Sequence, residues 1–132
     1  LEAFDLISKK PLFERIGAWQ GQVSVTNNVI YAVYGYRNGP ANLYALDERT
    51  GDIQWVWTPT QEDAFYPVSF IASDNLIFIS GMLNTYAVDI KTHETVWTYP
   101  QAGKLAISQD NKLFITGLDG SVHAIALTQN EK

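Results

Sequence analysis

The 132-residue sequence contains no cysteine. This absence excludes a disulfide framework, a thiolate zinc site and a cysteine nucleophile. Basic residues are also scarce, because nine Lys and Arg stand against fourteen Asp and Glu and give a formal net charge of −5. A negatively charged chain is repelled by a polyphosphate backbone. Nucleic acid is therefore not an expected partner.

Long apolar runs are missing as well. No segment approaches the roughly 20 apolar residues that a membrane-spanning helix needs, so no membrane span is expected. With 46% hydrophobic and only 17% charged residues, the chain can bury a core and is not a disordered segment. Its length fits one ordinary domain. The first residue is Leu1 and not Met, which leaves open a processed protein, with a signal peptide removed, or an excised piece.

An internal repeat organises the chain. Asp5, Asp47 and Asp89 are spaced 42 residues apart. A fourth copy begins at Val122 with a shorter spacing. The same frame aligns small residues two positions before each Asp and aromatic residues eight positions after it: Ala3, Ala45 and Ala87, and Phe13, Trp55 and Trp97.

Short apolar runs separated by turn residues fill each repeat. The runs are rich in Val, Ile, Phe and Tyr and lack helical periodicity, which predicts β-strands and no helix. The third repeat gives strands A, B, C and D at 67–72, 76–80, 85–89 and 95–99. Over the whole chain the strands read C-D, A-B-C-D, A-B-C-D and A-B-C. A repeat of about 40 to 45 residues with four antiparallel strands is typical of a β-propeller blade.

The predicted fold is therefore all-β, a partial propeller of about three blades. The domain is predicted as a single propeller segment over 1–132, with blade material in 1–15, 22–57, 67–99 and 103–127.

The segment 45–55 resembles the tryptophan-docking motif A-x-D-x-x-T-G-x-x-x-W of PQQ-like (quinoprotein-type) propeller repeats. All five specified positions match, and the next copy departs only in having His93 in place of Gly. The copy that starts at Ala3 is weaker, because it lacks both the Gly and the Trp. The matching residues are Ala45, Asp47, Thr50, Gly51 and Trp55, followed by Ala87, Asp89, Thr92 and Trp97.

These residue types also fit a structural role without the family name. Asp47 and Asp89 follow strand C, where a short carboxylate accepts hydrogen bonds from turn amides. Gly51 permits the positive φ that the reversal into strand D needs. Trp55 and Trp97 are expected to be largely buried between neighbouring blades.

PQQ-like repeats occur in quinoprotein dehydrogenases and in non-catalytic scaffolds, so the repeat alone does not make an enzyme. The alcohol dehydrogenases that the motif resembles carry an adjacent cysteine pair, and they close more blades around PQQ and calcium than this chain contains. No cofactor, metal or catalytic residue is therefore expected here. Asp5, Asp47 and Asp89 recur at one turn, as structural residues do. His93 begins no complete H-E-x-x-H motif and His123 stands alone.

The favoured function is a non-catalytic propeller repeat domain that serves as a protein-protein interaction or ligand-binding scaffold. In this reading the chain is similar in kind to the scaffold propellers of outer-membrane assembly lipoproteins. That resemblance implies a protein partner and an extracytoplasmic location. Whether the chain is an enzyme stays open, since the alternative is a fragment of a PQQ-dependent quinoprotein dehydrogenase whose cofactor site lies mostly outside this chain. A structural spacer within a surface protein is a third reading.

Candidate recognition residues come from the longest connections, 35–40 and 58–66, together with Trp19 on the same face. Aromatic and Arg side chains are enriched at protein contact hot spots. Trp19, Tyr36, Arg37, Phe65 and Tyr66 are therefore expected on one face of the propeller. The alternative is that the aromatic residues only pack the mouths of their own blades.

The two ends of the strand sequence leave blades incomplete. The chain begins with strands C and D and ends with strands A, B and C, so sheet edges stay uncovered in an isolated copy. A homo-oligomer would close the propeller if strands A and B at the end of one copy paired with strands C and D at the start of another. The segment 121–126, which already holds the C position, would have to be displaced. The competing reading is that the missing blades of a longer parent chain cover the ends.

Overall fold

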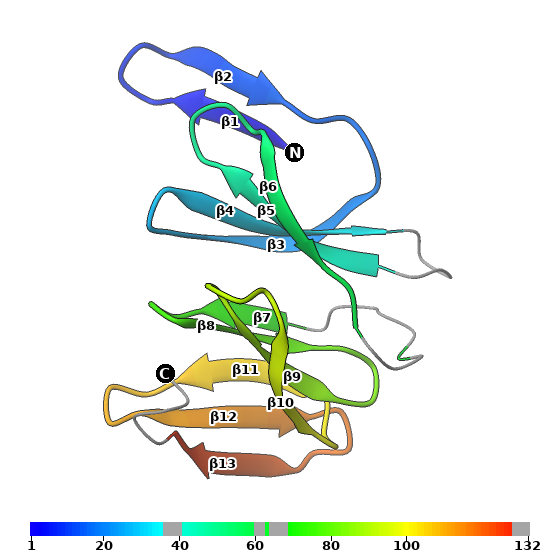
Figure 1. Cartoon of the computed structure of the whole chain (residues 1–132). Coiled ribbons are helices and arrows are strands. Elements are labelled where there is room, and N and C mark those ends of the chain that lie inside the picture. The colour runs from blue at the N-terminus through cyan, green and yellow to red at the C-terminus, as the bar shows by residue number, and fades with distance from the viewer. Residues whose placement is uncertain (36–40, 60–62, 64–68, 128–132) are drawn as a thin grey trace.

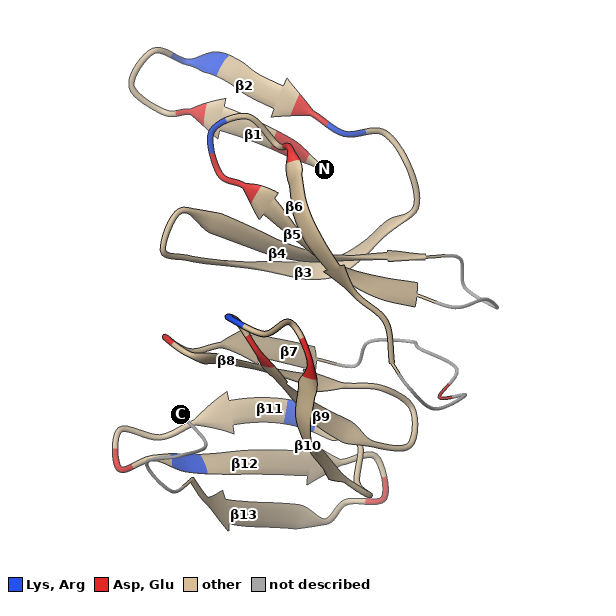
Figure 2. Cartoon of the chain, viewed as in Figure 1, with Lys and Arg blue, Asp and Glu red and all other residues tan. Residues whose placement is uncertain are grey.

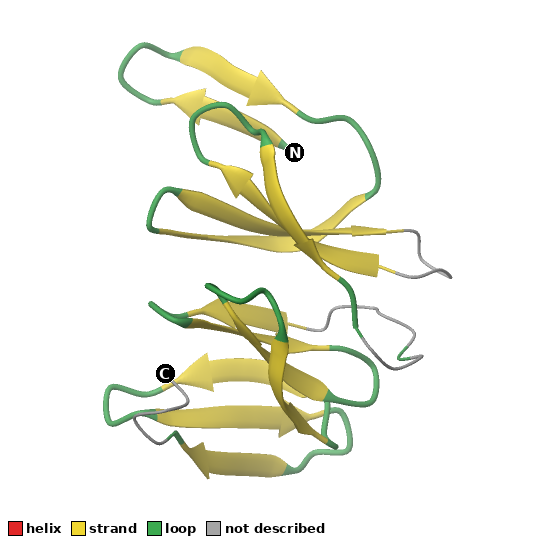
Figure 3. Cartoon of the chain, viewed as in Figure 1, coloured by secondary structure: helices red, strands yellow, loops and turns green. Residues whose placement is uncertain are grey.

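The computed structural model describes residues 1–35, 41–59, 63 and 69–127. Within these residues the chain forms strands only, as predicted, and no helix (Figure 3). The strands are β1 Glu2–Asp5, β2 Lys10–Glu14, β3 Trp19–Thr26, β4 Val29–Gly35, β5 Ala41–Asp47, β6 Ile53–Trp57, β7 Ser69–Ala72, β8 Leu76–Ser80, β9 Thr85–Asp89, β10 Thr95–Tyr99, β11 Gly103–Ile107, β12 Lys112–Gly117 and β13 Val122–Ala126.

The strands form four antiparallel sheets that lie one above another (Figure 1). Two strands, β1 and β2, make the first sheet; β3 to β6 and β7 to β10 make four-stranded sheets; β11 to β13 make a three-stranded one. This is the predicted division of strands, and β8, β9 and β10 have the predicted bounds. The chain is thus a partial propeller. One boundary was wrong, because β3 begins at Trp19 and not at 22.

Turn residues with positive φ connect the strands within a sheet. Asn27 and Asn28 have φ of 51° and 62°, and Asn111 has 61°. Asn tolerates this left-handed region because its short side chain bonds locally. These residues therefore allow the tight reversals between β3 and β4 and between β11 and β12.

Two hydrophobic cores hold the sheets together. Strand β8 is buried on both faces. Ile77 and Ile79 belong to the core between the second and third sheets, and Leu76 and Phe78 belong to the core between the third and fourth. A fully buried aliphatic or aromatic side chain contributes about 1.5–3 kcal/mol. Strand β3 also contacts β7, and β7 contacts β11, so the first strands of successive sheets adjoin.

The β1–β2 hairpin packs on the turn between β5 and β6. A Cβ atom at Gly51 would lie 2.4 Å from Phe13 Cδ2, and Gly51 has φ of 74°. Both facts restrict this position to glycine. Arg15 donates from its Nε to the carbonyl of Gly51. The first sheet is therefore anchored by one aromatic contact and one hydrogen bond.

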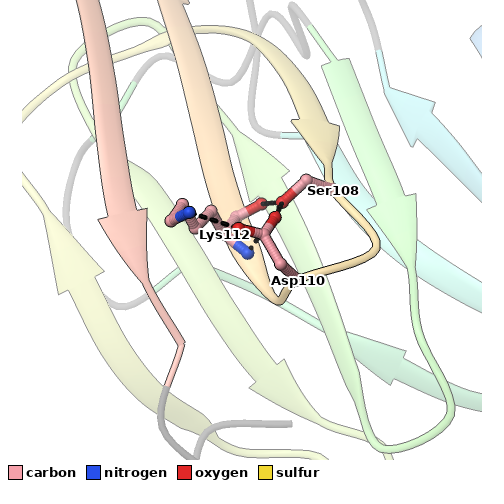
Figure 4. Close-up of polar contacts among 3 residues, drawn as sticks. All are labelled: Ser108, Asp110 and Lys112. Carbon is pink, nitrogen blue, oxygen red and sulfur yellow. Dashed lines mark hydrogen bonds and ion pairs between the residues drawn. The ribbon is translucent and has the colours of Figure 1, made fainter.

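Charged residues lie mostly in turns and at strand ends, while the sheets are largely uncharged (Figure 2). A cluster of three polar side chains, from Ser108, Asp110 and Lys112, closes the β11–β12 turn (Figure 4). Ser108 Oγ donates to Asp110 at 2.6 Å, and Lys112 Nζ pairs with the other carboxylate oxygen. The bonds from Lys112 and then Ser108 lower the pKa of Asp110 to about 2.

Candidate interaction surface

The Asp residues of the repeat bind the turns that follow them. Asp47 Oδ1 accepts from the amides of Arg49 and Thr50 at 2.9 and 3.0 Å. Asp89 Oδ1 accepts from the amides of Lys91 and Thr92 at 2.7 and 2.9 Å. The bonding expected of both carboxylates is present. The amide of Thr50, then that of Arg49, lowers the pKa of Asp47, and the amide of Thr92 does most to lower that of Asp89.

The aromatic residues of the repeat reach the next sheet. Trp55 stacks on His93 of the β9–β10 turn, with ring centres 4.4 Å apart and planes 13° apart. His93 has φ of 62°, so it occupies the glycine position in the left-handed region. Trp55 and Trp97 are only partly buried, short of the predicted burial. Each sits on the last strand of its four-stranded sheet, Trp55 on β6 and Trp97 on β10.

Trp57 makes the deeper contact between these sheets, and the repeat motif does not include it. Its side chain is 3% exposed, and its Nε1 donates to Thr95 Oγ1 at 2.9 Å. The indole also packs against Tyr86, with ring centres 5.4 Å apart. A residue two positions after the motif Trp thus joins β6 to β10.

An aromatic groove opens between the β1–β2 hairpin and the second sheet. We use this name for the groove lined by Trp19, Tyr34, Tyr44 and Ile53 of the sheet and by Glu14, Arg15, Ile16 and Thr50. Trp19 meets Tyr34 and Tyr44 edge to face at 5.1 and 5.5 Å. Trp19 Nε1 is buried and has no hydrogen-bond partner among the residues that the structure describes. The groove therefore presents aromatic side chains of the second sheet.

Of the five predicted recognition residues, Trp19 alone lies in the described part of the chain. Tyr36, Arg37, Phe65 and Tyr66 lie outside it. Trp19 belongs to strand β3 and packs on Tyr34 and Tyr44 of its own sheet. This packing agrees with the alternative prediction that the aromatic residues pack within their own blades. Trp19 also lines the aromatic groove. Tyr34 and Tyr44 were not predicted as site residues, because each stands among the apolar residues of an ordinary strand, β4 or β5.

A buried carboxylate was also missed. Asp63, between β6 and β7, is 5% exposed. It accepts from the amides of Met82, Leu83 and Asn84 at 3.1, 3.1 and 3.0 Å and from the Tyr86 hydroxyl at 3.1 Å. The Asn84 side chain adds a longer bond of 3.4 Å. Asp63 thereby fixes the connection between the second and third sheets to the β8–β9 turn.

The two histidines have structural partners. His93 stacks on Trp55. His123 bonds the Tyr99 hydroxyl through Nδ1 at 3.1 Å and the Ser121 hydroxyl through Nε2 at 3.0 Å. Across the described ranges, no three His, Asp or Glu residues gather closely enough to hold a metal ion. In the same ranges there is no helix with the length and apolarity needed to span a membrane.

Comparison with known proteins shows the fold. No protein-family model matches the chain, and no curated protein matches it. The crystal structure of BamB from Moraxella catarrhalis is similar, with a TM-score of 0.64 and 24% identity over 83% of this chain and 34% of that one. The structure of a europium-containing methanol dehydrogenase is also similar, with a TM-score of 0.58 and 20% identity over 82% of this chain and 21% of that one.

The chain therefore spans about a third of the first protein and about a fifth of the second. Both likenesses support a PQQ-like propeller fold.

Proposed function

We propose that this chain is a non-catalytic PQQ-like propeller segment that binds another protein, and that residues 1–132 act as one unit. The aromatic groove carries the proposal. It presents Trp19, Tyr34 and Tyr44 beside Arg15, and aromatic and Arg side chains are those enriched at protein contact hot spots.

Exposed apolar residues of the first sheet and of its link to the second support the same proposal. Ile16, which lines the groove, is 90% exposed. Leu6 and Ile7, in the turn at the other end of the β1–β2 hairpin, are 87% and 94% exposed and line a separate hollow. Exposed apolar patches on a protein mark interaction sites. In this proposal Tyr36, Arg37, Phe65 and Tyr66 extend the recognition surface, and the protein acts outside the cytoplasm.

The experiment is selection of displayed random peptides on the immobilised chain, followed by affinity measurement with the enriched peptides. The proposal expects the affinity to fall at least tenfold for Tyr44→Ala, because the groove loses an aromatic wall. The matched control is Leu118→Ala, which removes an exposed apolar side chain from the β12–β13 turn. Equal binding to the wild type and both variants would contradict the groove as the binding site.

The likeness to a methanol dehydrogenase fits a second reading, in which the chain is part of a PQQ-dependent quinoprotein dehydrogenase. Addition of PQQ and calcium, followed by dialysis and an absorption spectrum, separates the two readings. Retained quinone absorbance would favour the dehydrogenase. The scaffold proposal expects the absorbance to be lost on dialysis.

A further inference from the structure

The β8–β9 turn holds a carboxylate that comes from another part of the chain. Met82 donates its amide to Asp63 Oδ1 at 3.1 Å, and Asn84 donates its amide to Oδ2 at 3.0 Å. The amide of Leu83, between them, lies 3.1 and 3.3 Å from the two oxygens. Successive backbone N–H groups that converge in this way form a nest, which is a common anion-binding device of proteins. The turn therefore has the form of a carboxylate-binding site, and Asp63 is its occupant.

Other groups hold these donors in place. Ser80 and Thr85 pair across β8 and β9 at the base of the turn. Ser80 Oγ accepts from the amide of Gly103 at 2.8 Å, and Thr85 Oγ1 donates to the carbonyl of Gln101 at 2.6 Å. Both bonds tie the base of the turn to the segment that leads into β11. A site that is fixed by its surroundings loses little conformational entropy when a ligand binds.

Glycine at position 81 makes room for the carboxylate. Its φ lies outside the left-handed region, so the backbone of the turn does not require glycine here. The three atoms nearest to a Cβ at this position all belong to Asp63, and Oδ2 is the closest at 2.7 Å. An alanine at position 81 would therefore occupy the place where the carboxylate binds.

The corresponding turn of the fourth sheet supplies its own carboxylate. Asp119, within the β12–β13 turn, accepts from the amide and the hydroxyl of Ser121 at 3.0 and 2.6 Å. The β8–β9 turn is closed instead by the bond from the Gly81 amide to the Asn84 carbonyl at 2.8 Å, and 81–84 include no acidic residue. Its carboxylate comes from outside the turn, as a ligand does.

The residues that bind the carboxylate also carry exposed apolar side chains. Met82 and Leu83 are 47% and 66% exposed, although their amides bind a buried group. A ligand that combines a carboxylate with an apolar side chain fits these neighbours, and the last residue of a polypeptide can offer both. Backbone nests are a recurring means of capturing a C-terminal carboxylate.

We propose that the β8–β9 turn is a binding site for the C-terminal carboxylate of a partner protein. Asp63 occupies this site in the free chain, where it is 5% exposed, and leaves it when the partner binds. Asp63 thus acts as an internal competitor. The proposal rests on the protein-binding function above but shares no residue with the aromatic groove.

The first test empties the site. Asp63→Ala removes a carboxylate of the size of formate. Sodium formate should restore at least half of the lost urea midpoint, and sodium chloride at the same concentration should not, because a ligand that binds only the folded state stabilises it. The wild type and Asp74→Ala should respond alike to both salts, since Asp63 fills the site in both. Adding Gly81→Ala to Asp63→Ala should abolish the recovery, because the new Cβ blocks the site.

The second test compares N-acetylleucine, which mimics a C-terminal residue, with N-acetylleucinamide, which lacks the carboxylate. In NMR titrations only N-acetylleucine should shift the amide resonances of 82–84. Its affinity should rise at least tenfold from the wild type to Asp63→Ala, with Asp63→Asn between them, because the side chain at position 63 competes for the site. Asp63→Asn keeps the volume of the side chain, so this comparison holds even if Asp63→Ala does not fold.

The outcomes separate the parts of the inference. Recovery by formate without binding of N-acetylleucine would restrict the site to small anions and overturn the C-terminal assignment. Equal affinity of N-acetylleucine for the wild type and the Asp63 variants would overturn the site itself, as would equal binding of the amide. These measurements do not involve the aromatic groove, whose own test is Tyr44→Ala, so either proposal can fail alone.

Discussion

Replacing Asp63 with Ala removes the acceptor of five donor groups at once. A hydrogen bond to a charged group contributes about 1.5–3 kcal/mol, and an orphaned buried donor costs about 1–3 kcal/mol. The amides of Met82 and Leu83 lie beside exposed side chains, so water replaces much of what they lose. The Tyr86 hydroxyl is buried and has only the weaker contact with Asn84 left. We expect a loss of about 3–5 kcal/mol, because two or three of these terms remain after water has replaced the rest.

Urea unfolding with linear extrapolation measures this loss. Asp63→Asn keeps the volume and part of the acceptor capacity, and it should cost about 1–2 kcal/mol. Tyr86→Phe removes one donor and should cost about 1 kcal/mol. Gly81→Ala should also destabilise, because its Cβ would lie 2.7 Å from Asp63 Oδ2.

The control for these variants is an exposed aspartate of the β7–β8 turn. Asp74→Ala should stay within about 0.5 kcal/mol of the wild type. If Asp63→Ala also stayed within that range, the carboxylate would not anchor the β8–β9 turn.

Three further outcomes are expected. Trp57→Phe loses the bond to Thr95 and should lower the free energy of unfolding by about 1–2 kcal/mol in urea melts. Turn amides lower the pKa of Asp47, so its contribution is complete above the unfolded-state pKa and is lost as pH falls through the folded-state pKa. Asp47→Asn should therefore destabilise at pH 7, and its difference from the wild type should shrink as pH falls through the folded-state pKa of Asp47. His93→Ala keeps the positive φ and loses the stacking on Trp55, which should cost about 1 kcal/mol, whereas His93→Gly should be nearly neutral.

Strand positions were predictable because each sheet repeats one pattern. Short apolar runs bounded by Asn and Asp turns predict β8 and β9 to the residue. The roles of Asp47 and Asp89 were also predictable, since a carboxylate after a strand finds turn amides within two or three residues. These features depend only on residues that are close together in the sequence, so they can be predicted from it.

Contacts between sheets were harder to predict. Trp55 and Trp57 lie on the same strand two residues apart, and the sequence pattern does not say which of them the next sheet covers more fully. In the structure Trp57 is buried and Trp55 is partly exposed. No sequence pattern marks Asp63, because four of its five donors come from the β8–β9 turn and the fifth is Tyr86 of β9, all about 20 residues later in the chain. Trp19 was misplaced in a loop because a register irregularity interrupts β3 after Gln20.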